Sequence, residues 1–263
     1  MKPCLVAAFF ILLSFSSCVR SSNTIDRKTA LNKGSINGNR LKKTPAKNLV
    51  PVVGYRFTIT GDFDGKGKKE ILTEHFISGI DYKETNKFYE NGDYDTLVHL
   101  NTKKKPISLL TCNDKHIHDL IIDSKGYSLG LAYLKNEGDL DGDGVDEISY
   151  VVDWADWSNV NFCVIMTYKN HKWKELYTFQ IRDWQLPDLP QTYNQYGIAG
   201  LENKIINTED TVANRKIEKN LMNFKGFVKK VANHKIQIIY CTDDGQIDTI
   251  IVDIRKYHHK KRV

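Results

Sequence analysis

Residues 138–148 read GDLDGDGVDEI, and this stretch decides the local fold around it. Its acids alternate with other residues at loop positions one, three, five and nine, and two glycines permit the tight turn that such spacing needs. Segments typical of β-strands lie on both sides of it. The loop positions are occupied by Asp139, Asp141, Asp143 and Glu147, with the carbonyl of Val145 at position seven.

Four carboxylates this close in sequence repel one another unless a cation neutralises them. Calcium binds six to eight oxygen ligands, and alternating carboxylates on a tight turn supply them. An EF-hand is the obvious rival, but its loop needs a bidentate acid at position twelve and helices on both sides. Position twelve here is Tyr150. The spacing therefore predicts a calcium loop between two strands, whose role is to hold a hairpin together rather than to catalyse a reaction.

The same plan occurs earlier in the chain, where residues 61–71 read GDFDGKGKKEI. Lys66 stands at position five in place of an acid, so a calcium ion is less well supported there, and the ammonium is expected to form an internal ion pair instead. Residues 240–250 look like a shorter, degraded third copy. The acids that the first copy retains are Asp62, Asp64 and Glu70.

These loops resemble the calcium hairpins of the FG-GAP and VCBS repeat families, which occur in integrin-α-like β-propellers. The resemblance covers the loops and their flanking strands only. It implies that Asp139, Asp141, Asp143, Val145 and Glu147 bind calcium, and it carries over Asp62, Asp64 and Glu70 at the first loop. The domain is too short for a large ring of four-stranded blades. A small or incomplete propeller and a β-sandwich-like fold both remain open.

The rest of the domain also favours an all-β, mainly antiparallel fold. Short segments rich in β-branched and aromatic residues alternate with Gly, Asp and Asn. One short helix is expected near residues 208–225, with Thr208 as its cap and Gly226 at its end. Its apolar face would carry Ile217, Leu221 and Phe224. The expected strands include residues 55–60, 129–134, 147–152, 162–168 and 236–240.

The N-terminus has the features of an export signal. Residues 5–13 (LVAAFFILL) are apolar but too few to span a bilayer, and Lys2 precedes them. Residues 15–18 (FSSC) resemble a bacterial lipobox, which implies cleavage after residues 1–17 and lipidation of Cys18. Residues 18–50 are basic and lack apolar periodicity, as expected of a flexible tether. The chain is then an outer-membrane lipoprotein that faces the periplasm, attached to the membrane through Cys18.

Charge is distributed unevenly along the chain. Residues 51–254 hold 24 Lys and Arg against 31 Asp and Glu, a net charge of −7, whereas the basic tail at 255–263 carries +5. Nucleic-acid-binding modules place positive charge on the folded surface, so a nucleic-acid partner is not expected. Three cysteines remain for the domain, and an export compartment permits one disulfide among them without deciding which. They are Cys112, Cys163 and Cys241.

Two further groups of residues are candidates for contacts. Trp154, Asp156 and Trp157 follow the strand that leaves the 138–147 loop, where tryptophans beside carboxylates could bind a sugar or a protein partner, or fill the core. Trp173 and Trp184 are expected in the core. His116, His118 and Asp119 lie on an expected strand, whose alternation would put both imidazoles on one face; a solvated strand face is the simpler interpretation.

Signatures of enzymes are missing from the sequence, including the nucleophile elbow, the zinc-binding helix motif and the phosphate-binding glycine loop. The sequence therefore predicts a non-enzymatic envelope protein with a calcium-stabilised domain that binds another macromolecule. The repeat resemblance implies a sharper form, an inhibitor or immunity protein of a cell-wall-degrading toxin, and the acidic domain would suit a basic partner. The alternatives are a glycan-binding module, an accessory subunit of polysaccharide processing, or a structural envelope protein.

Overall fold

The computed structural model describes most of the chain beyond residue 50. The described residues are 51–53, 55–79, 82–84, 86–89, 105–122, 128–154, 159–187 and 211–256. Contacts divide the chain into a unit of residues 1–41 and a unit of residues 42–263, and all described residues belong to the second. The predicted signal peptide, Cys18, the tether and residues 257–263 of the basic tail lie outside the described residues.

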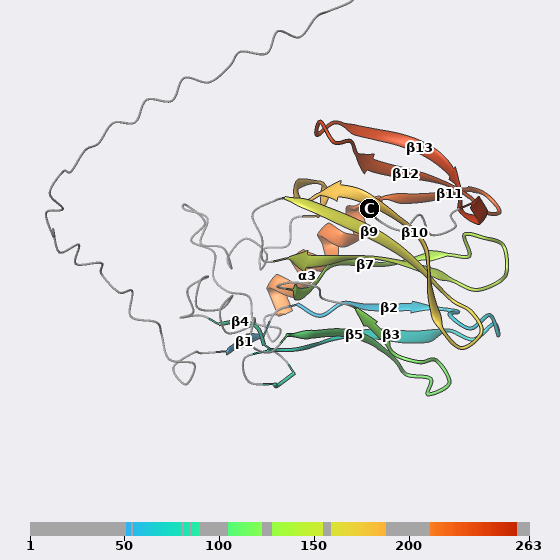
Figure 1. Cartoon of the computed structure of the whole chain (residues 1–263). Coiled ribbons are helices and arrows are strands. Elements are labelled where there is room, and N and C mark those ends of the chain that lie inside the picture. Colours follow the sequence, from blue (N-terminus) through green and yellow to red (C-terminus); the bar gives the residue numbers. More distant parts are fainter. Residues whose placement is uncertain are drawn as a thin grey trace, which may run out of the picture. The chain divides into compact units, whose positions relative to one another are not determined.

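Antiparallel sheets make up most of the second unit (Figure 1). The first sheet has four strands in the order β2-β3-β5-β6, and the second has four in the order β7-β8-β9-β10. All neighbouring strands in both sheets are antiparallel, and their order follows the chain, although β4 lies between β3 and β5 in the sequence and belongs to another sheet. The first sheet comprises β2 (Thr58–Gly61), β3 (Glu70–Ile77), β5 (Ile107–Cys112) and β6 (Leu120–Ile122), and the second comprises β7 (Ser128–Gly138), β8 (Glu147–Trp154), β9 (Val160–Tyr168) and β10 (Trp173–Arg182).

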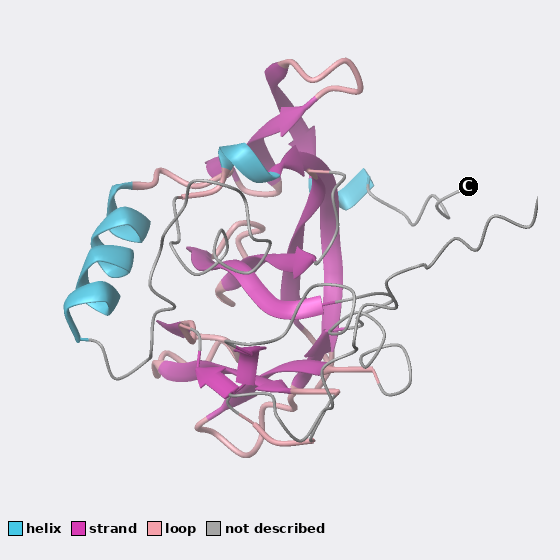
Figure 2. Ribbon diagram, turned by 90° about the vertical axis from the view of Figure 1, so that its left-hand side faces the viewer, coloured by secondary structure: helices cyan, strands magenta, loops and turns pink. Residues whose placement is uncertain are grey.

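The third sheet has only three strands, in the order β11-β12-β13. A separate two-stranded sheet pairs β1 with β4. One α-helix, α3, precedes the third sheet and is the long helix in Figure 2. The remaining elements are β1 (Pro51–Val53), β4 (Asn86–Tyr89), the 3-10 turn η2 (Asp183–Gln185), α3 (Thr211–Asn223), β11 (Val228–Ala232), β12 (Lys235–Cys241), β13 (Ile247–Asp253) and the 3-10 turn η3 (Ile254–Lys256).

The second sheet is the middle layer, with a hydrophobic cluster on each face. In β8, Ile148 and Val152 belong to the first core cluster, shared with the first sheet, whereas Val151 belongs to the second, shared with the third sheet. Every residue of β8 before Trp154 is buried. Burial on both faces includes the polar residues Glu147, Ser149 and Asp153 of β8, whereas a strand with one solvated face would expose its polar residues.

The all-β prediction is confirmed, and so is the helix near residues 208–225. Ile217 of α3 is fully buried in the first core cluster, and Leu221 packs against both clusters. Phe224 and Gly226 follow directly, and Gly226 adopts a φ of 82°, a left-handed conformation that suits glycine after a helix. The predicted cap Thr208 lies outside the described residues.

Two sequence-based expectations are wrong. His116 and His118 lie in the turn between β5 and β6, not on a strand. Asp114 closes this turn, because its carboxylate accepts the His116 N–H and its backbone carbonyl accepts the Ile117 N–H. Such a local turn competes with strand formation. Trp184 is 56% exposed rather than in the core, and Arg182 stacks on its ring. Trp173 does pack against the first core cluster.

Within the described part of the chain, no helix is both long enough and apolar enough to cross a bilayer.

Candidate metal centre

The second loop (residues 138–147) lies between β7 and β8 and brings three of the predicted metal ligands together. One carboxylate oxygen from each of Asp139, Asp141 and Asp143 lies within 4.8 Å of the other two. Gly142 and Gly144 both adopt a φ of 89°, which side-chain-bearing residues rarely do. The glycines therefore make the turn that gathers the acids.

Backbone amides of the same loop hold these carboxylates. The two oxygens of Asp139 accept the N–H groups of Gly142 at 2.5 Å and Gly144 at 3.2 Å. Asp141 accepts the Asp143 N–H at 3.1 Å, and Asp143 accepts the Val145 N–H at 3.0 Å. Each acid is thus oriented by local chain geometry. Val145 contributes this amide, and the role of its carbonyl as a ligand stays a prediction.

Glu147 is fully buried and does not belong to that close group of three. Its Oε2 accepts the Leu140 N–H at 2.6 Å, whereas its Oε1 is buried without a well-aligned hydrogen bond among the described residues, and the nearby Thr167 hydroxyl only partly stabilises its charge. Burial is the main reason that the pKa of Glu147 is raised to about 8, and the charge of Asp141 adds to the effect. A buried carboxylate oxygen without a well-aligned hydrogen bond is costly, and a cation would satisfy it.

Two lysines from other elements also contact the second loop. Lys169, at the end of β9, donates to Asp143 Oδ2 at 2.8 Å. Lys230 of β11 donates to the Asp139 carbonyl and lies 4.0 Å from the Asp139 carboxylate. The pKa of Asp141 is nevertheless raised, first by burial and then by the charge of Asp143. The two lysines therefore neutralise the negative charge of the three aspartates only in part.

The first loop (residues 61–70) repeats this construction between β2 and β3. Oxygens of Asp62, Asp64 and Glu70 lie within 4.8 Å of one another. Asp62 accepts the N–H groups of Lys66 at 3.0 Å and Gly67 at 2.7 Å, and Glu70 accepts the Phe63 N–H at 3.0 Å, as Glu147 accepts that of Leu140. The Lys66 ammonium forms an ion pair with Asp64, as the sequence predicted.

The two loops are hydrogen-bonded to each other. The Asp146 N–H donates to the Asp62 carbonyl at 2.8 Å, and the Asp62 N–H donates to Asp146 Oδ2 at 3.0 Å. Asn136 donates to the same Asp146 oxygen at 2.9 Å and to the Thr60 carbonyl at 2.9 Å. Sequence reasoning missed Asp146 because it lies at a variable position of the repeat, and its partners are distant in the chain.

The second loop also contacts the third sheet. The His234 N–H, in the turn between β11 and β12, donates to the Leu140 carbonyl at 3.2 Å. Together with Lys230, this joins the loop to β11 and to the turn that follows it. The second loop is therefore the meeting point of all three large sheets, so any ligand that rigidifies it acts on the whole domain.

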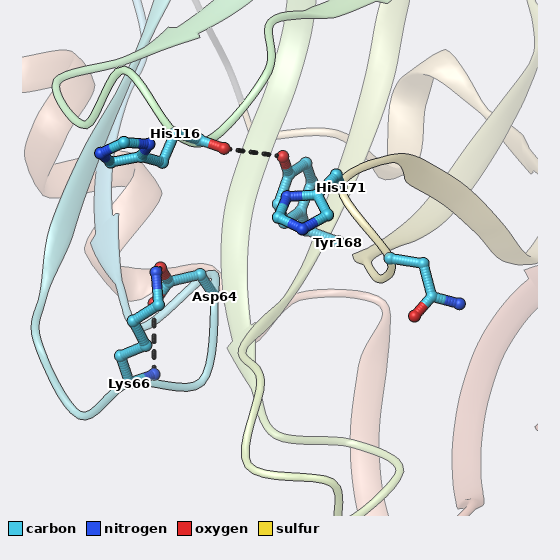
Figure 3. Close-up of a pocket in the computed structure, with 6 residues that line it drawn as sticks. Asp64, Lys66, His116, Tyr168 and His171 are labelled. Atoms are coloured by element: carbon cyan, nitrogen blue, oxygen red, sulfur yellow. Dashed lines mark hydrogen bonds and ion pairs between the residues drawn. The ribbon is translucent and has the colours of Figure 1, made fainter.

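A cavity of about 250 Å³ opens beside the first loop (Figure 3). It lies among the β2–β3 loop, the β5–β6 turn and the β9–β10 turn. Tyr168 is fixed at its wall, because its hydroxyl donates to the His116 carbonyl at 3.0 Å and accepts the His118 N–H at 3.1 Å. The lining residues are Asp64, Lys66, His116, Tyr168, Asn170 and His171.

The β9–β10 turn at the rim of this cavity has an unusual backbone. Asn170 and His171 both have positive φ angles, 55° and 58°. A two-residue hairpin turn of this kind requires positive φ at both central residues, and asparagine and histidine adopt it more readily than most residues. The tight turn therefore places Asn170 and His171 at the rim of the cavity.

Among the other predicted site residues, those that the structure describes lie apart from the two acidic loops or in the core. Trp154 is half-buried and packs against the first core cluster, whereas Asp156 and Trp157 lie outside the described residues. In the degraded third copy, Asp243 and Asp244 are exposed in the β12–β13 turn, where Thr242 rather than an acid organises the loop. Cys112, Cys163 and Cys241 are free thiols.

Comparison of the chain with protein-family models, with curated proteins and with solved structures finds no match.

Proposed function

We propose that this chain is a non-enzymatic, lipid-anchored envelope protein whose calcium-stabilised β-domain binds another macromolecule. The observation that carries the proposal is the group of Asp139, Asp141 and Asp143 beside the buried Glu147 oxygen that lacks a well-aligned hydrogen bond. Hard oxygen ligands of this density are the set that calcium prefers.

Calcium suits this group for two physical reasons. A divalent ion removes the repulsion among the three aspartates, which Lys169 and Lys230 offset only in part. It also provides a partner for the buried Oε1 of Glu147. The ligands would be Asp139, Asp141, Asp143 and Glu147, with the Val145 carbonyl at the remaining loop position. When bound, the ion supplies charge neutralisation and rigidity.

The position of the second loop explains why such an ion would matter to the whole domain. Asp146 links the loop to the first sheet, and Leu140 links it to the third. Stabilising the loop therefore fixes the turns of three sheets relative to one another, and those turns form the surface offered to a partner.

Calorimetric titration of the purified protein with calcium tests this proposal. We expect one site whose calcium affinity is clearly reduced in Asp141→Asn and unchanged in Asp114→Asn, a matched control in the β5–β6 turn. A second ion at the first loop is less favoured, because Lys66 already pairs with Asp64. Absence of a calcium-dependent heat at millimolar calcium would overturn the proposal.

The charge of the domain favours a basic partner, since 24 basic residues face 31 acidic ones between residues 51 and 254. Complementary charge raises association rates and selects partners. A basic hydrolase that degrades the cell wall is such a partner, and inhibition of a lysozyme-like toxin is the sharper form of the proposal. Adding the purified protein to such an enzyme on peptidoglycan tests it, and full activity at saturating protein would count against inhibition.

Anchoring through Cys18 is tested separately in cells that make the full chain. We expect radiolabelled fatty acid to be incorporated into the wild type and not into Cys18→Ala, and the label to fractionate with the outer membrane. Labelling that persists in Cys18→Ala would remove the lipoprotein proposal and leave the calcium proposal intact.

A second candidate function, glycan binding, is favoured by the cavity beside the first loop. A carboxylate, an ammonium, an amide and two imidazoles line it, and groups of this kind donate and accept hydrogen bonds with sugar hydroxyls. Retention on peptidoglycan or polysaccharide columns, compared between the wild type and His171→Ala, tests this function. Equal retention of both proteins would exclude the cavity as the sugar site.

A further inference from the structure

The third sheet has an open edge. It contains three strands whereas the other two large sheets contain four, and β13 is hydrogen-bonded on one side only, to β12. Figure 1 shows β13 as the outermost strand of this sheet. Among the described residues no strand lies against its other side, so that side leaves a row of backbone donors and acceptors without ladder partners.

The side chains of β13 are unusually apolar for such an edge. Ile247 is 58% exposed, Ile250 46% and Ile251 57%. Ile250 lies opposite the buried Ile238, on the face of the second core cluster, whereas Ile251 lies opposite Gln237 on the other face. Apolar surface is therefore exposed on both faces of the strand. Proteins usually protect an edge with lysine, proline or a bulge, and residues 247–253 contain none of these.

Within β13 and the turn before it, all charged side chains are acidic, and the nearest basic residues lie at the far end of the strand, at Lys235, Arg255 and Lys256. Residues 242–253 contain four aspartates and no Lys or Arg. Asp253 is paired with Arg255 at 2.6 Å, which leaves Asp243, Asp244 and Asp248 as acids without a basic partner in the segment. Two copies of this edge would bring like charges together, which disfavours self-pairing and favours a cationic strand.

We propose that the free edge of β13 receives an extended strand from a basic partner protein, a strand that alternates apolar residues with Lys or Arg. The added strand gives the third sheet its fourth member. Main-chain hydrogen bonds supply affinity, and alternate side chains supply specificity. Apolar side chains of that strand cover Ile250 on one face or Ile251 on the other, while its cations meet the aspartates. The inference rests on the proposed function in one respect, that the domain binds a macromolecule.

The test uses the purified protein and a labelled nine-residue peptide, Lys-Val-Lys-Ile-Thr-Val-Lys-Ile-Lys, followed by fluorescence anisotropy. Two comparison peptides separate strand pairing from simple charge attraction. One replaces each Lys by Glu, and the other keeps every Lys but replaces Thr and one Val by Pro, which removes backbone donors. We expect the first peptide to bind at least about tenfold more tightly than either.

Protein variants then locate the site. The double variant Ile247→Lys/Ile251→Lys puts two cations on the edge without changing a buried residue, and we expect at least about tenfold weaker binding. Ile121→Lys is the matched control, because Ile121 is 69% exposed on β6, an edge strand of the first sheet. Melting temperatures of all three proteins report whether they fold alike, and peptide binding should be unchanged in Ile121→Lys.

Several outcomes overturn the inference. They are equal binding of the proline peptide, equal binding by the double variant, or no binding of the basic peptide. A dimer in ultracentrifugation that the double variant loses would assign the edge to a second copy instead. Calcium titration on the same samples keeps the two proposals apart. If the protein binds calcium but not the peptide, only the inference about the β13 edge is contradicted. If it binds the peptide but not calcium, only the proposal of a calcium site is contradicted.

Discussion

Asp141→Asn tests the metal centre most sharply, because it acts in opposite directions with and without calcium. Asp141 is 8% exposed, and its carboxylate lies within 4.8 Å of those of Asp139 and Asp143. Asparagine keeps the oxygen that accepts the Asp143 N–H and removes the negative charge. The substitution therefore relieves repulsion in the metal-free protein, whereas in calcium it replaces a charged ligand oxygen by a neutral amide oxygen that binds the ion more weakly.

The magnitudes follow from these distances. Two unit charges 4.8 Å apart interact by about 3.5 kcal/mol at an effective dielectric constant of about 20. Asp139 and Asp143 are partly exposed to solvent, and Lys169 and Lys230 lie nearby. Both effects reduce the stabilisation gained by removing the Asp141 charge to about 1 kcal/mol. Calcium at one hundred times its dissociation constant stabilises by about 2.7 kcal/mol. In a domain of this size, 1 kcal/mol moves the Tm by about 2–4 °C.

Differential scanning calorimetry of the purified protein in calcium chloride and in EGTA measures both effects. We expect EGTA to lower the wild-type Tm by about 5–10 °C. In EGTA, Asp141→Asn should melt about 2–4 °C above the wild type, and calcium should raise its Tm less than that of the wild type. Asp114→Asn should respond to calcium as the wild type does. A wild-type Tm that is the same in both buffers, or an Asp141→Asn variant that is less stable than the wild type in EGTA, refutes the reasoning.

Three further predictions concern the loops. Asp146→Ala leaves the Asp62 N–H and the Asn136 amide without their acceptor, so urea denaturation should show a loss of about 1–3 kcal/mol; an unchanged midpoint would mean that the loops are not coupled. Gly61→Ala places a Cβ 2.4 Å from Asn136 Nδ2 and should lower the Tm, and adding Asn136→Ala should restore part of it. Because folding raises the pKa of Glu147 to about 8, the folded state binds the extra proton, and metal-free stability should fall as pH rises from about 4.5 to 8. Glu147→Gln should show a shallower slope than the wild type, because burial also raises the pKa of Glu137 and of Asp141, and an equal slope in both proteins would assign the effect to those groups.

The sequence predicted the geometry of the acidic loops well where the interactions are local. Asp139, Asp141 and Asp143 accept amides two to five residues further along, so their spacing alone fixes how they converge. The same reasoning placed Asp62 and Lys66 correctly. It could not find Asp146 or Lys169, because their partners lie 84 and 26 residues away in the chain.

Burial was the property that local patterns predicted least well. Trp184 looked like a core residue by its chemistry, but it lies in η2, after the end of β10, and its ring is exposed. His116 and His118 looked like strand residues, but Asp114 closes a turn there. Alternation also fails in β8, since both faces of the second sheet are covered and every residue before Trp154 is buried.

By itself the sequence determined the strand-rich fold, the short helix and the two acidic loops, because turn chemistry, side-chain alternation and ligand spacing act over a few residues. Only the tertiary structure decided that the second loop joins three sheets, that Glu147 keeps a buried oxygen without a well-aligned hydrogen bond, and that β13 ends a sheet with its edge open. Each of these depends on which distant segments lie side by side, and that is set by packing of the whole domain rather than by any one segment.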